Sequence, residues 1–312
     1  MRKFVINATI AIVFLVTVLG FEELTFFKTP SKVSYKFQYI RENANRIEIL
    51  CLGSSLEQNG VCPTYFHHSA FNAASASQSP EIDYAIVTYF FDSLVSLKVL
   101  ILPLSYFSLR HIDAFGGIPY YYYLHFTDIH LPHTDFARYS AIRSFSFRNV
   151  HKENMRFLSG KYVMNIDSLG WEECQSSFDN FSERDKNYNA SCFAADNIQK
   201  CGTDITLNLQ RYKAIIERCR ERNVNVILVS LPKTNHFLTK INENQLRHVQ
   251  EEGSQIEQQY ENVTYVNFFN DTNFHDDDFY NANHLNPQGA KKVTLILDSI
   301  IENHILNKHF SF

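Results

Sequence analysis

Short apolar runs that alternate with helical stretches constrain the fold of this chain more than any other feature of its sequence. Four runs have the pattern of buried strands: residues 47–52, 98–104, 224–232 and 263–268. Four further stretches have the pattern of helices: residues 81–97, 204–222, 241–260 and 287–306. Strands that alternate with helices predict an α/β fold with a parallel sheet covered on both sides.

The composition excludes several classes of protein. Of 312 residues, 45% are hydrophobic and 20% are charged, which rules out a wholly disordered chain and allows a full core. The net charge of -4 gives no electrostatic reason to expect a nucleic-acid partner. No metal-ligand spacing and no phosphate-binding glycine loop occurs, so we expect neither a metal nor an organic cofactor.

The N-terminus predicts export. Residues 4–20 form an apolar run directly after Arg2 and Lys3, and as a helix this run would be about 26 Å long. That length fits a short membrane anchor or a long signal-peptide core, and Val18 and Gly20 would suit cleavage. We expect residues 1–22 to anchor the chain in the cell membrane with the body outside. The alternative is a secreted or periplasmic protein after signal cleavage.

The remaining chain divides into a tether and one interrupted domain. Residues 23–45 are mixed and polar and are predicted to be a tether, and residues 46–307 a single domain. Residues 111–203 are too long for an ordinary loop and are predicted to be an irregular insertion. Its aromatic residues, Tyr120–Tyr123 with Trp171 and Phe178, fit a sugar-stacking platform, core packing or a partner interface about equally well.

Six cysteines permit disulfides in an exported protein. Cys51 and Cys219 lie in apolar patterns and are predicted to be buried thiols. Cys174, Cys192 and Cys201 lie in the insertion, where a bridge would stabilise the chain most.

Two segments carry residues suited to nucleophilic catalysis. Gly53-Ser54-Ser55 follows the first strand, and a serine in such a turn becomes a nucleophile when a base takes its proton and backbone N–H groups receive the oxyanion. The same residues also fit an ordinary turn. His284 lies just before the helix that starts at Asn286 and Pro287, and a histidine there could be the general base. The carboxyl ends of parallel strands share one edge, which predicts that Ser55, 231–237 and 275–286 meet there.

Together these segments resemble the SGNH (GDSL-like) hydrolase superfamily. The matching stretches are GSS (53–55), FNAASASQS (71–79), LKVLILPLSYFSL (97–109) and FYNANHLNPQGAKK (279–292). The resemblance is greatest to the membrane-anchored, envelope-modifying branch, which includes alginate O-acetyltransferase-like proteins and the teichoic-acid D-alanyl-transfer protein. It covers about residues 46–110 and 204–306. It implies a flavodoxin-like three-layer α/β/α sandwich, with Ser55 as nucleophile and His284 as base.

The family usually has an aspartate three residues before the histidine, where this chain has Asn281. An amide oxygen can hold one imidazole tautomer but carries no charge, and the same replacement in a serine-protease triad costs ~10⁴ in rate. Asn281 therefore fits a weak enzyme, a dyad supported by a backbone carbonyl, or an inactive relative. Asp278 is the candidate substitute acid, although the acidic run 276–278 also fits a solvated loop.

The oxyanion donors are less clearly marked. Where the family has a glycine in its second block, this chain has Ala73, Ala74 and Ser75. The candidates for oxyanion or substrate contact are Ser54, Ser75, Gln78 and Asn72. For Asn72, fixing the loop is the stronger interpretation.

These features predict an exported serine esterase or acyltransferase. Its expected substrates are O-acyl groups, with O-acetyl favoured, of a cell-envelope polysaccharide or other acylated glycan, processed through an acyl-Ser55 intermediate. A membrane protein that delivers the acyl group is the expected partner for a transferase. The alternative is a catalytically weak or inactive relative that binds glycan or a membrane partner through its aromatic insertion.

Overall fold

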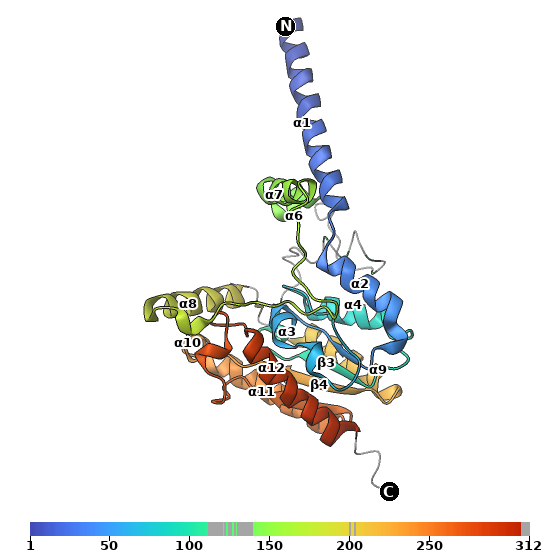
Figure 1. Ribbon diagram of the computed structural model, residues 1–312, viewed down its shortest axis with the longest axis vertical. Coiled ribbons are helices and arrows are strands. Elements are labelled where there is room, and N and C mark those ends of the chain that lie inside the picture. The colour runs from blue at the N-terminus through green and yellow to red at the C-terminus, as the bar shows by residue number, and fades with distance from the viewer. Residues whose placement is uncertain are drawn as a thin grey trace. The chain divides into compact units, whose positions relative to one another are not determined.

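The computed structural model describes residues 1–111, 121, 123, 127, 129, 140–199, 201–202 and 204–306 (Figure 1). The chain forms two compact units. The N-terminal unit consists of Met1–Tyr35 and Gly116–Met164, and the sheet unit consists of Lys36–Phe115 and Asn165–Phe312.

The sheet unit is built on five parallel strands. They are β1 (Ile49–Cys51), β2 (Ala70–Asn72), β3 (Val99–Pro103), β4 (Asn225–Ser230) and β5 (Val263–Asn267). Their order is β2-β1-β3-β4-β5, the flavodoxin-like order in which β2 is added on one side of β1 and the later strands on the other. In register, Ile49 of β1 pairs with Ala70 on one side and Val99 on the other. The predicted fold class, a three-layer α/β/α sandwich on a parallel sheet, is confirmed.

Helices cover the sheet. They are α2 (Lys32–Asn43), α3 (Ser55–Gly60), α4 (Pro80–Phe90), α8 (Glu183–Gln199), α9 (Thr206–Glu221), α10 (Asn235–Leu238), α11 (Glu243–Gln259) and α12 (Pro287–Ile300). Short helical turns are η1 (Ala44–Arg46), η2 (Pro63–Tyr65), η3 (Ser108–Arg110), η6 (Phe178–Asn180), η7 (Asp276–Asp278) and η8 (Ile301–Leu306). α4 packs against α9, whereas α12 packs against α3.

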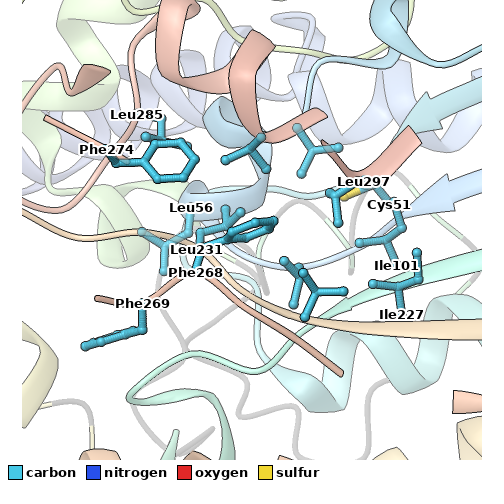
Figure 2. Packing of buried hydrophobic residues seen from close by; sticks show 14 of the residues in the cluster. Cys51, Leu56, Ile101, Ile227, Leu231, Phe268, Phe269, Phe274, Leu285 and Leu297 are labelled. Carbon is cyan, nitrogen blue, oxygen red and sulfur yellow. The ribbon is translucent and has the colours of Figure 1, made fainter. Parts of the chain in front are cut away.

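The strand side chains alternate between two faces, as the period of a strand requires. Ile49 and Val99 belong to one buried cluster with residues of α3 and α12. Cys51, Ile101 and Ile227 of the same cluster are seen in Figure 2. The intervening strand residues are buried as well, because a parallel sheet has both faces covered. This continuous burial explains why the strands appear in the sequence as uninterrupted apolar runs.

The observed elements differ from the predicted ones in several places. β2 was not predicted, because it spans three residues and carries no clear alternation. The helix predicted over 81–97 ends at Phe90. Within the expected insertion, α8 is a helix of 17 residues. The division of the chain also cuts this insertion twice: residues 116–164 belong to the N-terminal unit, and the parts before and after them belong to the sheet unit.

The expected tether is helical. α1 (Arg2–Lys28) continues past the apolar run, and α2 follows after three residues. Phe37 and Ile40 of α2 are buried, and the Phe37 ring lies 4.7 Å from the ring of Phe90 between centroids. Residues of α2 therefore belong to the packed sheet unit.

In the N-terminal unit, α6 (Ala141–Phe145) and α7 (Phe147–Leu158) pack against α1. Within the described ranges, one helical stretch is long and apolar enough to cross a membrane, and it begins at Arg2 with none of its most apolar window buried. A membrane anchor and a signal sequence both have these properties.

Candidate active site

Ser55 is presented by a turn that passes directly from β1 into α3. Gly53 has a φ of 127°, and a Cβ atom there would lie 2.5 Å from Glu57 Oε2, so the turn requires glycine. Ser54 caps the helix: its hydroxyl accepts from the Leu56 N–H, while its own N–H donates to Glu57 Oε2 at 2.9 Å. Ser55 becomes the first residue of α3, half-buried at the carboxyl end of β1.

His284 lies in a tight loop organised around one amide oxygen. The loop closes through a hydrogen bond from the Tyr280 N–H to the His284 carbonyl at 3.0 Å. Inside it, Asn281 Oδ1 accepts from the N–H groups of Asn283 (2.9 Å) and His284 (3.0 Å). Asparagine and aspartate both favour such turns, because their side chains bond to backbone N–H groups two and three residues further on.

The loop brings His284 to Ser55. The distance from Ser55 Oγ to His284 Nε2 is 2.8 Å, and that from His284 Nδ1 to Asn281 Oδ1 is 3.1 Å. Two backbone N–H groups already point at Asn281 Oδ1, which identifies that atom as the oxygen of the amide. His284 Nδ1 must then carry a proton to bond to it. Nε2 is left unprotonated, and it accepts the hydrogen of the Ser55 hydroxyl.

Both side chains are held by core residues next to them in sequence. Leu56 and Leu285, which follow Ser55 and His284, lie in the same buried cluster (Figure 2). The ring of Phe193, on α8, meets the imidazole edge to face at 5.4 Å between centroids. His284 is only 8% exposed, so its imidazole has little freedom to turn away from Ser55.

A buried acid and a buried base flank this pair. Glu57 is fully buried, and burial raises the pKa of its carboxyl group despite the positive charge of Lys233 and hydrogen bonds from Ser54. Burial likewise lowers the pKa of Lys233, which the charge of Glu57 opposes. Lys233 Nζ donates to the carbonyl of Asn283 at 2.8 Å, so this amino group supports the loop directly before His284.

The candidates of the second block lie beside the Gly53 turn, but most of their polar groups are already bonded. Asn72 Nδ2 donates to the carbonyls of Glu57 and Val61 at 2.8 and 2.7 Å, so its N–H groups serve the loop and not an oxyanion. Gln78 Nε2 donates to Asp83 at 2.7 Å. The Ser75 N–H donates to the Gly53 carbonyl at 3.0 Å. Of the polar groups of Ser75, its hydroxyl is therefore the one that could contact an oxyanion.

Asp278 does not take the place of the acid. Its carboxylate accepts from Lys292 Nζ at 2.6 Å and from the His275 N–H at 3.0 Å, and the residue is fully buried. The alternative interpretation of a solvated loop is also wrong for Asp278. The group that contacts His284 Nδ1 is the amide of Asn281.

Three residues of the site were not among the predicted catalytic and oxyanion residues. Phe193 lies in the insertion, to which the sequence resemblance does not extend. Lys233 lies in the segment 231–237 that was predicted to reach this edge of the sheet, where an exposed loop was the stronger interpretation. Glu57 could have been predicted. Glutamate lies three residues after Ser54, which is the pattern of a helix capping box.

Of the aromatic residues considered for a sugar platform, the described Tyr121, Tyr123 and Phe178 are buried. Tyr121 and Phe178 are 2% and 0% exposed. The Tyr121 ring packs edge to face on Phe26 of α1, and Phe178 lies in the core cluster of the sheet unit. The half-buried Trp171 donates its indole N–H to the Asn59 carbonyl at 2.8 Å. Tyr120 and Tyr122 lie outside the described residues.

All six cysteines are described, and all six are free thiols. Cys51 and Cys219 are buried, as predicted. Cys174, Cys192 and Cys201, where a disulfide was expected to stabilise the chain most, form none. In the described part of the chain, no cluster of three or more His, Cys, Asp or Glu side chains is arranged to hold a metal.

Comparison with known proteins gives similar solved structures and no matching family. No family model matches the chain, and no curated protein matches it. Among solved structures it is similar to a "putative acylhydrolase" from Bacteroides fragilis, at 10% identity and a TM-score of 0.42, covering 88% of this chain and 96% of that one. It is also similar to "a putative platelet activating factor" from Streptococcus pneumonia, at 10% identity and a TM-score of 0.41, covering 95% and 99%.

Proposed function

We propose that this chain is an SGNH-like serine esterase or O-acyltransferase that works through an acyl-Ser55 intermediate. The observation that carries the proposal is the hydrogen bond of 2.8 Å between Ser55 Oγ and His284 Nε2. A serine next to an unprotonated imidazole nitrogen, with the other nitrogen held by an acceptor, is the arrangement that nucleophilic acyl transfer requires.

In the proposed reaction, Ser55 Oγ attacks the acyl carbonyl carbon while His284 Nε2 takes the hydroxyl proton. The oxyanion that forms collapses, the C–O bond to the first alcohol breaks, and His284 returns the proton to the leaving oxygen. Water or a sugar hydroxyl then attacks the acyl-Ser55 ester, again with His284 as base, and Ser55 is restored. The candidate oxyanion donors are the N–H of Ser55, which as the first residue of α3 has no helical carbonyl to bond, and the hydroxyl of Ser75.

The proposed substrates are O-acyl groups, with O-acetyl favoured, of a cell-envelope polysaccharide, with a membrane acyl-donor protein as partner for a transferase. The apolar, unburied stretch of α1 and the basic residues before it support a body held outside the cytoplasm. The sequence resemblance to envelope-modifying proteins points to the same class of substrate.

A fluorophosphonate probe tests the nucleophile, because it reacts covalently with an activated serine. We expect the folded protein to be labelled at Ser55 and the Ser55→Ala variant to remain unlabelled. His284→Gln should slow labelling on the order of 10²-fold or more, since it removes the base. The Ser54→Ala variant is the matched control: it loses a helix cap worth about 1 kcal/mol but keeps the nucleophile, and it should still be labelled. Failure of the folded wild-type protein to react would refute the proposed chemistry.

A further inference from the structure

Helix α7 of the N-terminal unit has an apolar stripe that no described residue covers. Phe147, Met155 and Leu158 are 41%, 51% and 55% exposed. At about 100° per residue they fall on one side of the helix, together with His151, whose ring stacks on Phe147. The buried residues of α7, Val150 and Asn154, lie on the neighbouring side.

A basic stripe runs along the other border of this apolar stripe. Arg148, Lys152 and Arg156 follow each other at intervals of four residues and are exposed. Arg156 pairs with Glu153 at 3.3 Å, whereas no described residue forms an ion pair with Arg148 or Lys152. An apolar stripe bordered by cationic side chains is the pattern of a helix that lies in a membrane interface.

The attachment of α7 to α1 puts these stripes next to the end of the apolar run. Glu22, two residues after that run, is 5% exposed and accepts from His151 Nδ1 and Asn154 Nδ2, both at 2.6 Å. Glu23 accepts from the backbone N–H groups of Ala141 and Ile142, at the start of α6. These contacts fix both short helices at the level where a spanning α1 would leave the hydrocarbon core.

The contacts also define which side of α7 faces the apolar run. Val150 belongs to a buried cluster with Phe26, one turn beyond Glu22. His151, which is part of the apolar stripe, instead reaches back to Glu22. The stripe therefore lies on the side of α7 turned toward the apolar run, and α7 itself lies across α1 rather than along it (Figure 1).

We propose that α7 docks on an anionic lipid surface, with its apolar stripe in the acyl-chain boundary and its basic stripe at the lipid phosphates. Lipid phosphates complement Arg148, Lys152 and Arg156, and the acyl chains cover Phe147, Met155 and Leu158. The proposal rests on α1 being a retained anchor and is independent of the chemistry at Ser55.

Quenching of tryptophan fluorescence by brominated lipids tests this docking in the full-length protein. The chain is reconstituted in phosphatidylcholine vesicles with or without phosphatidylglycerol, and the signal of the native Trp171 is subtracted. With phosphatidylglycerol, Leu158→Trp and Met155→Trp should be quenched about twofold more than the control Asn149→Trp, because interfacial helices bury their apolar face ~5–10 Å. Adding Arg148→Gln, Lys152→Gln and Arg156→Gln to Leu158→Trp should remove most of that difference.

Every outcome of this experiment bears on the docking. Phe14→Trp, within the apolar run, reports whether α1 is inserted. If Phe14→Trp is quenched while Leu158→Trp matches Asn149→Trp, the anchor stands and the docking of α7 is refuted. If the tryptophan of Leu158→Trp becomes buried only when the protein self-associates, and not on binding to vesicles, a second copy covers the apolar stripe and the lipid proposal is overturned. Equal quenching with and without phosphatidylglycerol overturns the role of the basic stripe. The fluorophosphonate labelling of Ser55 tests the proposed chemistry separately, so its outcome does not depend on whether α7 docks on lipid.

Discussion

Asn281 shapes the loop and orients His284, as a triad aspartate would, but it carries no charge. Its oxygen closes the loop through two backbone N–H groups and holds the Nδ1 proton of His284. As a neutral group, it would supply no negative charge to the imidazolium of the proposed reaction. In that reaction the orientation of His284 is provided, whereas the electrostatic stabilisation of its charged form is reduced.

Replacing Asn281 with aspartate should therefore raise the rate of ester hydrolysis. The carboxylate keeps the three acceptor contacts and adds a charge next to His284, so we expect kcat/KM for p-nitrophenyl acetate to rise at least tenfold, within the ~10⁴ that this charge is worth in proteases. Asn281→Ala, which removes the acceptor, should lower the rate below that of wild type. A rate unchanged by Asn281→Asp would mean that another group already stabilises the charged imidazole.

At the scale of elements, Glu48 ties together the segments that lead into three neighbouring strands. Its carboxylate bonds to Lys98 Nζ at 2.6 Å, before β3, and to the Ser69 N–H and His68 Nδ1 at 3.1 and 3.2 Å, before β2. Partial burial acts to raise the pKa of Glu48, but these hydrogen bonds and the charge of Lys98 outweigh it and lower the pKa to about 2. The ionised carboxylate therefore stabilises the amino-terminal edge of the sheet.

This contribution should depend on pH in a defined direction. A carboxyl whose pKa is lowered by folding stabilises the protein above its unfolded value of 4.5, and the stabilisation is lost as the pH falls toward about 2. Glu48→Gln should reduce the free energy of unfolding by about 1 kcal/mol at neutral pH, since the pair is partly exposed. In urea titrations the difference from wild type should shrink below pH 4.5.

The matched control is Glu42→Gln. Glu42 is exposed on α2 and bonds to Gln38 one turn earlier, so its replacement should change stability little at any pH. A Glu48→Gln variant that loses as much stability at acid pH as at neutral pH would contradict the role given to the ionised carboxylate.

At the scale of the whole molecule, the proposed export places the sheet unit outside the cytoplasm. Cys192 on α8 is an exposed free thiol, whereas Cys51, Cys62 and Cys219 are buried. It is a natural reporter of topology, because a maleimide that cannot cross membranes reaches it only from the side on which it lies.

We expect a membrane-impermeant maleimide to label Cys192 in intact cells, after removal of any outer barrier but without lysis. Cys192→Ser should lose most of the label, since Cys174 and Cys201 are half-buried. Labelling of the protein that appears only after lysis would place the sheet unit in the cytoplasm and refute the proposed export.

Local patterns were sufficient for the α/β class and for part of the site. Hydrophobic periodicity and helix caps are properties of neighbouring residues, so the positions of β1, β3, β4 and β5 and the start of α12 at Asn286 and Pro287 were predictable. Because parallel strands end at a common edge, Ser55 and His284 were predicted to meet there, although 229 positions separate them.

Only the tertiary structure decided how the remaining polar and aromatic residues are used. Whether Asp278 bonds to His284 or to Lys292, whether Lys233 is solvated or buried near Glu57, and whether Tyr121 and Phe178 are displayed or packed depend on partners far away in the chain. The energy of a charge or a ring is determined by its surroundings, through desolvation and packing, and those surroundings exist only once the chain has folded.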